Sequence, residues 1–201
     1  MSQVEPGGRR SERRPLTVLT VGHGARSIEA FLDLLRGAAV TRLVDVRTAP
    51  GSRKHPQFGR DALAASLERA GIAYEWSPDL GGWRKPRPDS RHTALRSAGF
   101  RGYADHMETE EFRSALRSVI DAPSRERVAI MCAESLWWRC HRRLIADALD
   151  APGVEVLHLM EGGRQEPHRR SEAARIDDLG RLVYDRAAPE PPAQASLLDG
   201  S

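Results

Sequence analysis

The amino-acid sequence predicts an α/β protein: a single domain with a mostly parallel sheet of about five strands and helices on both faces. Short apolar runs alternate with segments of helical periodicity over most of the chain, which is the pattern of strands joined by crossover helices. The apolar runs are nearly continuous, as is typical of parallel strands buried on both faces. The length of 201 residues, with 40% hydrophobic and 29% charged residues, suits one globular domain with a full core.

The first half of the chain supplies three of the predicted strands. Leu16 to Val21 is an apolar run that predicts a buried strand, closed by Gly22-His23-Gly24. Ser27 is a suitable N-cap for a helix whose apolar residues recur at helical spacing from Ile28 to Leu35. A strand, a loop, a helix stopped by Gly71 and another strand then follow at residues 43–47, 48–60, 61–70 and 72–76.

The second half begins with a long segment that shows no periodicity. Residues 77–99 contain mainly Gly, Pro, Arg and Ser, and loops of this length in compact domains are usually functional or mobile. Two short helices, a strand, a helix, a strand and an edge strand are predicted at residues 103–107, 109–120, 127–132, 137–149, 154–159 and 182–184. Residues 1–15 and 187–201 have the composition of disordered tails, which leaves a catalytic domain at 16–186.

Several classes of protein are excluded by composition. The Arg-rich N-terminus has no apolar segment of the kind that a secretory signal needs. No apolar run approaches the roughly 18 residues of a membrane span. Two cysteines are too few for a disulfide framework, and free thiols fit a reducing compartment best. We therefore expect a cytoplasmic protein that does not bind membranes.

Polar and ionisable side chains follow the predicted strand ends. They are His23, Asp45, Arg47, Ser77 to Asp79, Cys132, Glu134 and His158. Because the carboxyl ends of parallel strands meet at one edge, where α/β proteins bind ligands, these residues predict a functional site. The densest part is Cys132-Ala133-Glu134 followed by Cys140-His141-Arg142, where a strand stops at a thiol and the next helix opens with reactive side chains.

Positive charge is concentrated in two clusters, although the net charge is only +3. One contains Arg47, Arg53, Lys54 and Arg60, and the other contains Arg84, Lys85, Arg87, Arg91, Arg96 and Arg101 with Asp89 as the one acid among them. Such clusters are typical of a phosphate-binding face. The alternative is that arginine simply replaces lysine on solvated loops.

Seven segments, in order between Leu16 and Tyr184, resemble the domain-of-unknown-function family 488. They are Thr20-Val21-Gly22-His23, Leu43-Val44-Asp45-Val46-Arg47, Pro50 to Arg53, Pro56-Gln57-Phe58, Leu80-Gly81-Gly82, Phe100-Arg101-Gly102-Tyr103-Ala104-Asp105, and the Cys132-Ala133-Glu134 and Cys140-His141-Arg142 pair. Part of that family is associated with DNA glycosylase activity on 5-hydroxymethyluracil. The resemblance therefore implies base excision repair on double-stranded DNA with a flipped base.

A glycosylase must bind the phosphate backbone, extrude a base and stabilise an oxocarbenium-like sugar while water attacks. We expect Asp45 and Glu134 to be the catalytic carboxylates. The residues expected to bind the substrate are His23, Arg47, Phe58, Tyr103, Cys132, Cys140, His141 and Arg142, with Trp83, Trp137 and Trp138 as further stacking faces. Those expected to contact the DNA backbone are Arg53, Lys54, Arg84, Lys85, Arg87 and Arg91.

No cofactor is expected, because this hydrolysis needs none and Gly22-His23-Gly24 is too short for a nucleotide-binding loop. Three other functions stay open. One is a phosphatase-like or sulfurtransferase-like enzyme with Cys132 as nucleophile. Another is a metal site at Cys132, Cys140 and His141, although no fourth ligand stands out and we expect no metal. The third is a nucleic-acid-binding module without catalysis.

Structural roles are the alternative for the individual residues. Asp45 and Arg47 are also suited to an ion pair that holds a loop, Glu134 to a helix cap, and Cys132 to a small buried apolar side chain. The C-terminal tail carries a separate signal. Residues 194–199 resemble peptides that bind the bacterial sliding clamp, with Gln194, Leu197 and Leu198 as the anchoring side chains.

Overall fold

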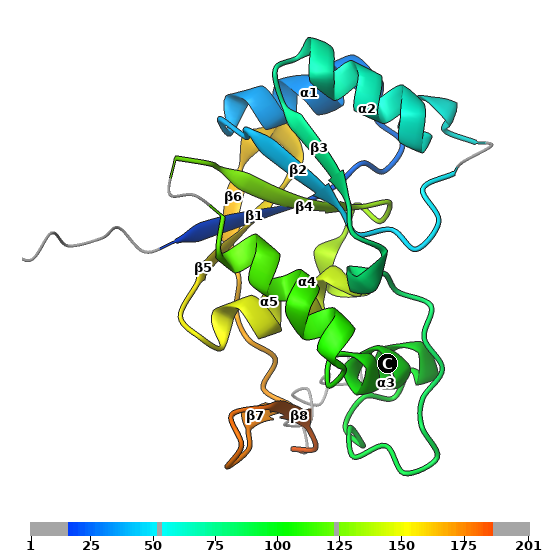
Figure 1. Ribbon diagram of the computed structural model, residues 1–201, viewed down its shortest axis with the longest axis vertical. Helices are drawn as coiled ribbons and strands as arrows, with labels where there is room; N and C mark the ends of the chain where they lie inside the picture. The colour runs from blue at the N-terminus through cyan, green and yellow to red at the C-terminus, as the bar shows by residue number, and fades with distance from the viewer. Residues whose placement is uncertain (1–15, 52–53, 123–124, 187–201) are drawn as a thin grey trace, which may run out of the picture.

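The main sheet contains six strands in the order β3-β2-β4-β1-β5-β6 (Figure 1). The computed structural model describes residues 16–51, 54–122 and 125–186. The strands are β1 (Thr17–Gly22), β2 (Arg42–Asp45), β3 (Ala73–Trp76), β4 (Val128–Cys132), β5 (Glu155–Leu159) and β6 (Gln165–Pro167). All neighbouring pairs are parallel except β5–β6. The predicted α/β fold with a mostly parallel sheet is confirmed, and β6 is a strand that the sequence analysis missed.

Helices cover both faces of this sheet (Figure 1). On one side lie α1 (Ile28–Gly37) and α2 (Arg60–Arg69), and on the other α3 (Ala98–His106), α4 (Glu110–Ile120) and α5 (Arg142–Asp150). Two apolar cores result. In β1, Leu19 and Val21 belong to the core under α1 and α2, while Val18 belongs to the other, as the alternation of side chains along a strand requires.

The helix starts follow the local sequence in two cases. The Ser27 hydroxyl accepts a hydrogen bond from the backbone N–H of Ala30 at 3.2 Å, which confirms the predicted N-cap of α1. Thr109 caps α4 in the same way through the N–H of Phe112, at 3.3 Å. No helix among the described residues is long and apolar enough to cross a membrane.

The prediction of one helix over 137–149 is wrong. A 3₁₀ turn, η3 (Trp137–Arg139), is followed by extended backbone at Cys140, with φ −117° and ψ 153°, and α5 begins only at Arg142. Tertiary contacts override the helical spacing here. The Trp137 ring stacks on His158 of β5, with ring centroids 4.0 Å apart, and the Cys140 side chain faces Cys132.

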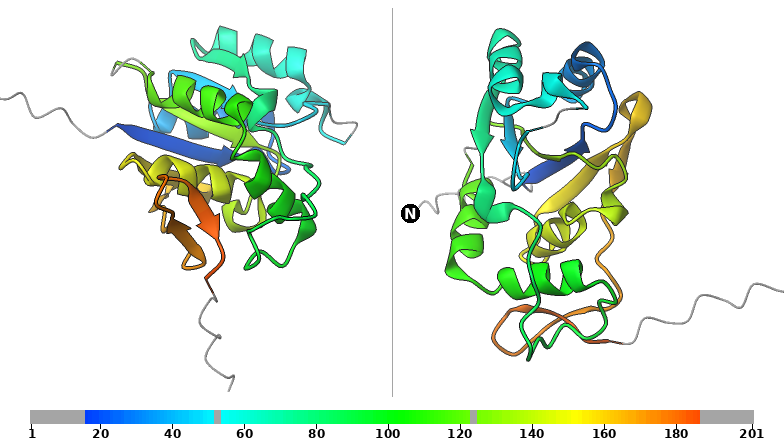
Figure 2. Two further views of the ribbon diagram at one scale, coloured as in Figure 1. Left: turned by 60° about the horizontal axis from the view of Figure 1, so that its bottom comes forward. Right: turned by 90° about the vertical axis from the view of Figure 1, so that its right-hand side faces the viewer.

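The edge strand predicted at 182–184 exists but does not join the main sheet. This strand, β8 (Leu182–Tyr184), pairs antiparallel with β7 (Ala174–Ile176) in a separate two-stranded sheet. Both views in Figure 2 place this hairpin at the end of the molecule that carries α3. The Tyr184 hydroxyl donates to Asp147 Oδ2 of α5 at 2.9 Å, which ties the hairpin to the helix layer.

The predicted loop at 77–99 contains a 3₁₀ turn, η2 (Pro78–Leu80), and ends where α3 begins, five residues before the predicted start of that helix. Two further 3₁₀ turns are η1 (Pro56–Phe58) and η4 (Glu161–Gly163). The two predicted tails and the clamp-binding residues Gln194, Leu197 and Leu198 lie outside the described residues, as does Arg53.

Candidate functional site

A cavity of about 670 Å³ opens at the carboxyl ends of β1, β2 and β4. Its lining comes from the loops after these strands, from the segment around Gly82 and Trp83, and from the start of α3. Seven of the predicted site residues line it, namely His23, Arg47, Tyr103, Cys132, Glu134, Cys140 and His141. The convergence expected from the strand ends is therefore present, and Asp45, Phe58 and Arg142 lie outside the lining.

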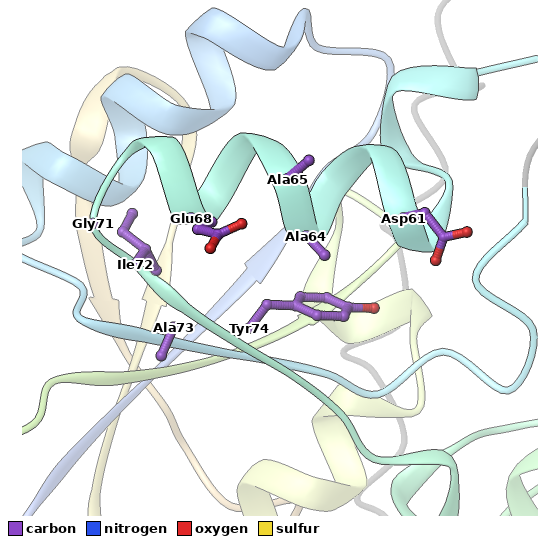
Figure 3. A pocket seen from close by; sticks show the side chains of 8 residues that line it. All are labelled: Asp61, Ala64, Ala65, Glu68, Gly71, Ile72, Ala73 and Tyr74. Atoms are coloured by element: carbon purple, nitrogen blue, oxygen red, sulfur yellow. The ribbon is translucent and has the colours of Figure 1, made fainter.

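A second hollow, of about 650 Å³, lies between α2 and β3 (Figure 3). Half of its lining residues are Ala or Gly, and the others are Ile72, the carboxylates of Asp61 and Glu68, and the ring of Tyr74. The Tyr74 hydroxyl is already engaged, because it donates to Asp45 at 2.9 Å. The lining of this hollow contains no Arg, Lys, His or Cys, so the candidate site is the cavity at the strand ends.

Asp45 is completely buried, and its carboxylate is saturated with hydrogen bonds. Oδ1 accepts from the backbone N–H of Arg47 at 3.1 Å and from its Nε at 2.8 Å. Oδ2 accepts from Arg47 Nη2 at 2.6 Å and from the Tyr74 hydroxyl at 2.9 Å. The ion pair considered as an alternative in the sequence analysis is thus formed. Asp45 supports Arg47 from behind and presents no oxygen to the cavity.

The Arg47 side chain extends from this ion pair to the cavity wall. Its Nη1 donates to the carbonyl of Phe58 at 2.8 Å and lies 3.4 Å from Nε2 of His23. Nδ1 of His23 is 2.9 Å from the carbonyl of Gly24, which can only accept, so this nitrogen holds the proton and Nε2 is free to accept from Arg47. Burial lowers the pKa of His23 to about 4, so the ring is neutral near pH 7.

Phe58 takes a different place from the one expected of a stacking face for the substrate. It is completely buried, and its ring lies flat against His23, with centroids 4.1 Å apart and planes 15° apart. It also packs against Phe31 of α1 in a T-shaped contact. Phe58 therefore connects the cavity wall to the core, and His23 is the ring that lines the cavity.

Glu134 is the carboxylate that lines the cavity, and it is exposed. Its Oε1 accepts a hydrogen bond from the N–H of Leu136 at 3.2 Å, which leaves Oε2 without a protein donor in the described residues. Two contacts hold its backbone. Arg142, which is buried, donates to the carbonyl of Glu134. A Cβ on Gly22 would lie 2.0 Å from that carbonyl oxygen, so the close approach of β1 requires glycine at this position.

Cys132, Cys140 and His141 form a compact group in the cavity floor, with one ligand atom from each within 4.8 Å of the others. The two sulfurs are 2.6 Å apart, and Nδ1 of His141 is 3.6 Å from the sulfur of Cys140. Nε2 of His141 donates to the carbonyl of Val46 at 3.1 Å, which leaves Nδ1 unprotonated. Burial lowers the pKa of His141.

Tyr103 is also part of this floor, and it is almost completely buried. Its ring lies against His141, with centroids 5.1 Å apart, and its hydroxyl donates to the carbonyl of Leu80 at 2.8 Å. Burial raises the pKa of Tyr103 well above the usual value, so the phenol stays protonated. Tyr103 therefore offers the cavity a ring face, while its hydroxyl fixes the segment before Gly81.

A buried chain of hydrogen bonds behind the cavity escaped the sequence analysis. Thr20 Oγ1 is 2.7 Å from His158 Nδ1, His158 Nε2 is 3.0 Å from His168 Nδ1, and His168 Nε2 is 2.9 Å from Asp147. Arg142 donates to Thr20 at 3.2 Å, so the chain reaches the residue that holds Glu134. Burial lowers the pKa of His158 to about 3. Only the position of His158 at a strand end signalled it in the sequence.

The basic residues predicted to contact DNA fall into two groups. Arg87 and Arg91 are occupied by acids, since both bind Glu108 and Arg91 also binds Asp177 at 2.9 Å. Lys54 and Lys85 are exposed, and Arg84 is half-buried and donates to two backbone carbonyls. Lys54, Arg84 and Lys85 have no acidic partner among the described residues, while the ion pairs of Arg87 and Arg91 anchor the loop after Trp83.

The cavity lining also includes Trp83, which was expected as a stacking face, and residues that were not predicted, such as His55, Ser135 and Arg139. Trp83 is the most prominent, because 86% of it is exposed and its φ of 59° is rare for a residue with a bulky side chain. The sequence signal was its place after Leu80-Gly81-Gly82. A tryptophan held in the open beside a cavity provides a stacking face for a planar ligand.

A family model described as a domain of unknown function, DUF488, matches residues 27–149, which is more than half of the 201 residues. The match spans α1 to α5 and includes the strand ends of β2 and β4 with most of the cavity lining. No curated protein and no solved structure matches the chain significantly.

Proposed function

Because the chain belongs to the family described as domain of unknown function DUF488, and because of its cavity, we propose that it is a DNA glycosylase that excises a modified uracil. The observation that carries the proposal is the lining of the cavity. An exposed carboxylate, a buried guanidinium and two neutral imidazoles line one space of about 670 Å³ at the carboxyl edge of the sheet. That volume lies within the range of about 300–1,000 Å³ that small organic ligands occupy.

The rim of the cavity suits a base that has been turned out of a duplex. Enzymes that act on an extruded base stack it against aromatic or apolar side chains and read its polar edge by hydrogen bonds. Trp83 and Phe100 line the cavity, and Trp83 is almost fully exposed. Arg84 and Lys85 follow Trp83 directly in the chain, and Lys54 is next to His55, which also lines the cavity. These three residues are proposed to supply positive charge for the phosphates on either side of the lesion.

Glu134 is the carboxylate proposed to act on water. In hydrolysis of the glycosidic bond, the water oxygen bonds to C1′ of the sugar, the bond from C1′ to the base nitrogen breaks, and the base leaves as an anion that takes a proton from solvent. A carboxylate takes the water proton and stabilises the positive charge that develops on the sugar. Glu134 lines the cavity, whereas Asp45 is buried and saturated, so we assign Asp45 to positioning Arg47.

Arg47 is proposed to stabilise the departing base. Negative charge develops on the uracil oxygens as the glycosidic bond breaks, and a cation held in a buried position stabilises it without reorganisation. Arg47 is only 7% exposed, and its ion pair with Asp45 fixes it in the cavity wall. The 5-hydroxymethyl group is a substrate expectation from the family resemblance, and its hydroxyl is suited to donate to the unprotonated Nδ1 of His141.

A panel of lesions tests the proposal. Labelled duplexes that carry 5-hydroxymethyluracil, uracil, thymine or an oxidised purine are incubated with the protein, and abasic sites are then cleaved with alkali. We expect strand breaks at 5-hydroxymethyluracil that are lost in Glu134→Gln. They should be retained in Glu161→Gln, which alters an exposed glutamate outside the cavity lining. Binding to every duplex without breaks at any lesion would instead identify a binding module.

A further inference from the structure

Two free thiols meet in the floor of the cavity, and the proposed hydrolysis does not use them. Cys132 ends β4, Cys140 lies two residues before α5, and both are about 5% exposed. Their sulfurs are 2.6 Å apart. The sulfur–sulfur distance is about 2.05 Å in a disulfide bond and about 3.7 Å between two thiolates bound to one tetrahedral zinc ion. The pair is therefore closer to forming a sulfur–sulfur bond than to holding a metal ion.

The surroundings make the two thiols unequal. Cys140 precedes the first turn of α5, where the N-terminal end of a helix stabilises an anion, and the unprotonated Nδ1 of His141 is 3.6 Å away to accept its proton. The hydrogen bond from Cys132 lowers the pKa of Cys140 to about 6, and Arg142 adds to this effect. The same hydrogen bond raises the pKa of Cys132, and burial raises it further.

From this contact and its asymmetry we infer that Cys132 and Cys140 are a redox-active pair, oxidised by a hydroperoxide that enters through the cavity. The Cys140 thiolate attacks the outer oxygen of the hydroperoxide, a sulfur–oxygen bond forms, and the oxygen–oxygen bond breaks. The alcohol, or water from hydrogen peroxide, leaves with a proton from solvent. Cys132 then attacks the Cys140 sulfenic acid, the sulfur–sulfur bond forms, and the hydroxyl leaves as water with the Cys132 proton. Two thiols lose two electrons, and one hydroperoxide is reduced.

The disulfide would close the segment from Cys132 to Cys140, which carries Glu134 and Arg139 on the cavity wall. Both thiols are largely buried, and both line the cavity, so a reagent reaches them through the cavity. This inference is independent of the proposed glycosylase activity, since the oxidation state of the thiols is measured directly and without DNA.

The test uses the reduced 201-residue protein, whose sequence contains only these two cysteines. One equivalent of hydrogen peroxide is added at pH 7, and the denatured protein is then titrated with a thiol reagent and weighed by mass spectrometry. We expect titratable thiols to fall from two to none, with a loss of about 2 Da and no covalent dimer. Two thiols that persist, or a gain of oxygen without a disulfide, would overturn the inference.

Two matched variants identify the attacking thiol. Cys132→Ser keeps a hydroxyl that can donate to Cys140, so the Cys140 sulfenic acid should form and be trapped by dimedone. In Cys140→Ser the remaining Cys132 should be trapped at least about ten-fold more slowly, because its thiolate fraction is small. Oxidation of the wild-type protein should be half-maximal near pH 6. Equal trapping rates in the two variants would contradict the assignment. So would one zinc ion per chain that is retained by the wild-type protein and lost in both variants.

Discussion

Replacement of Asp45 by Asn tests whether this carboxylate is a positioning group. Arg47 N and Nε both bind Oδ1, while Arg47 Nη2 and Tyr74 bind Oδ2. An amide nitrogen in place of either oxygen turns two of these four hydrogen bonds into contacts between donors. The guanidinium of Arg47, 7% exposed, would also lose its counter-ion. Removing one partner of such a buried pair destabilises a protein by about 3 to 5 kcal/mol.

Urea denaturation at pH 7 measures this effect. The midpoint should fall for Asp45→Asn with little change in the denaturant dependence of the unfolding free energy. Tyr74→Phe is the matched control, because it removes one of the four hydrogen bonds and keeps the ion pair, so we expect a loss of about 1 to 2 kcal/mol. If Asp45→Asn lies within about 0.5 kcal/mol of the wild-type protein, the buried ion pair is not what holds Arg47, and this reasoning is wrong.

Three further predictions concern pH, glycine and the rim of the cavity. His158 is buried in its neutral form, and its pKa is lowered from 6.5 to about 3, so protonation favours the unfolded state. In urea titrations, the free energy of unfolding should therefore fall as the pH drops from 6.5 towards 3, and this dependence on pH should be weaker in His158→Gln. Gly22→Ala should lower the free energy of unfolding by more than about 1 kcal/mol, because the new Cβ meets the Glu134 carbonyl. Gly37→Ala, whose new Cβ would have nothing within 4 Å, should raise it by up to about 1 kcal/mol, and the same urea titrations measure both changes. Trp83→Ala should leave stability within about 0.5 kcal/mol and weaken DNA binding about ten-fold in fluorescence titrations, and unchanged binding would remove the stacking role.

Local patterns in the sequence predict much of the fold. Continuous apolar runs predicted the strands β1 to β5, and a cap such as Ser27 located a helix start. Because parallel strands share one edge, the strand order did not have to be known to predict that His23, Arg47 and Glu134 would line one cavity. The short strands β6 and β7 carry no periodic signal over three residues each, and they were missed.

The details of the site depend on contacts that no local pattern encodes. The helical spacing at 137–149 was genuine, but the stacking of Trp137 on His158 breaks the helix and brings Cys140 to Cys132. Asp45 and Phe58 follow strand and loop ends as expected of site residues, yet both are buried behind the residues that line the cavity. Their side-chain directions are set by Arg47 and His23, which only tertiary structure reveals.

Direct detection of the released base tests the proposed function most closely. A duplex with one 5-hydroxymethyluracil is incubated with excess protein, and the free base is quantified by mass spectrometry over time. The wild-type protein and Glu161→Gln should release one base per duplex, and Glu134→Gln should be at least about a hundred-fold slower while it still binds the duplex. No free base from the wild-type protein, or equal rates with and without the Glu134 carboxylate, would contradict the proposal.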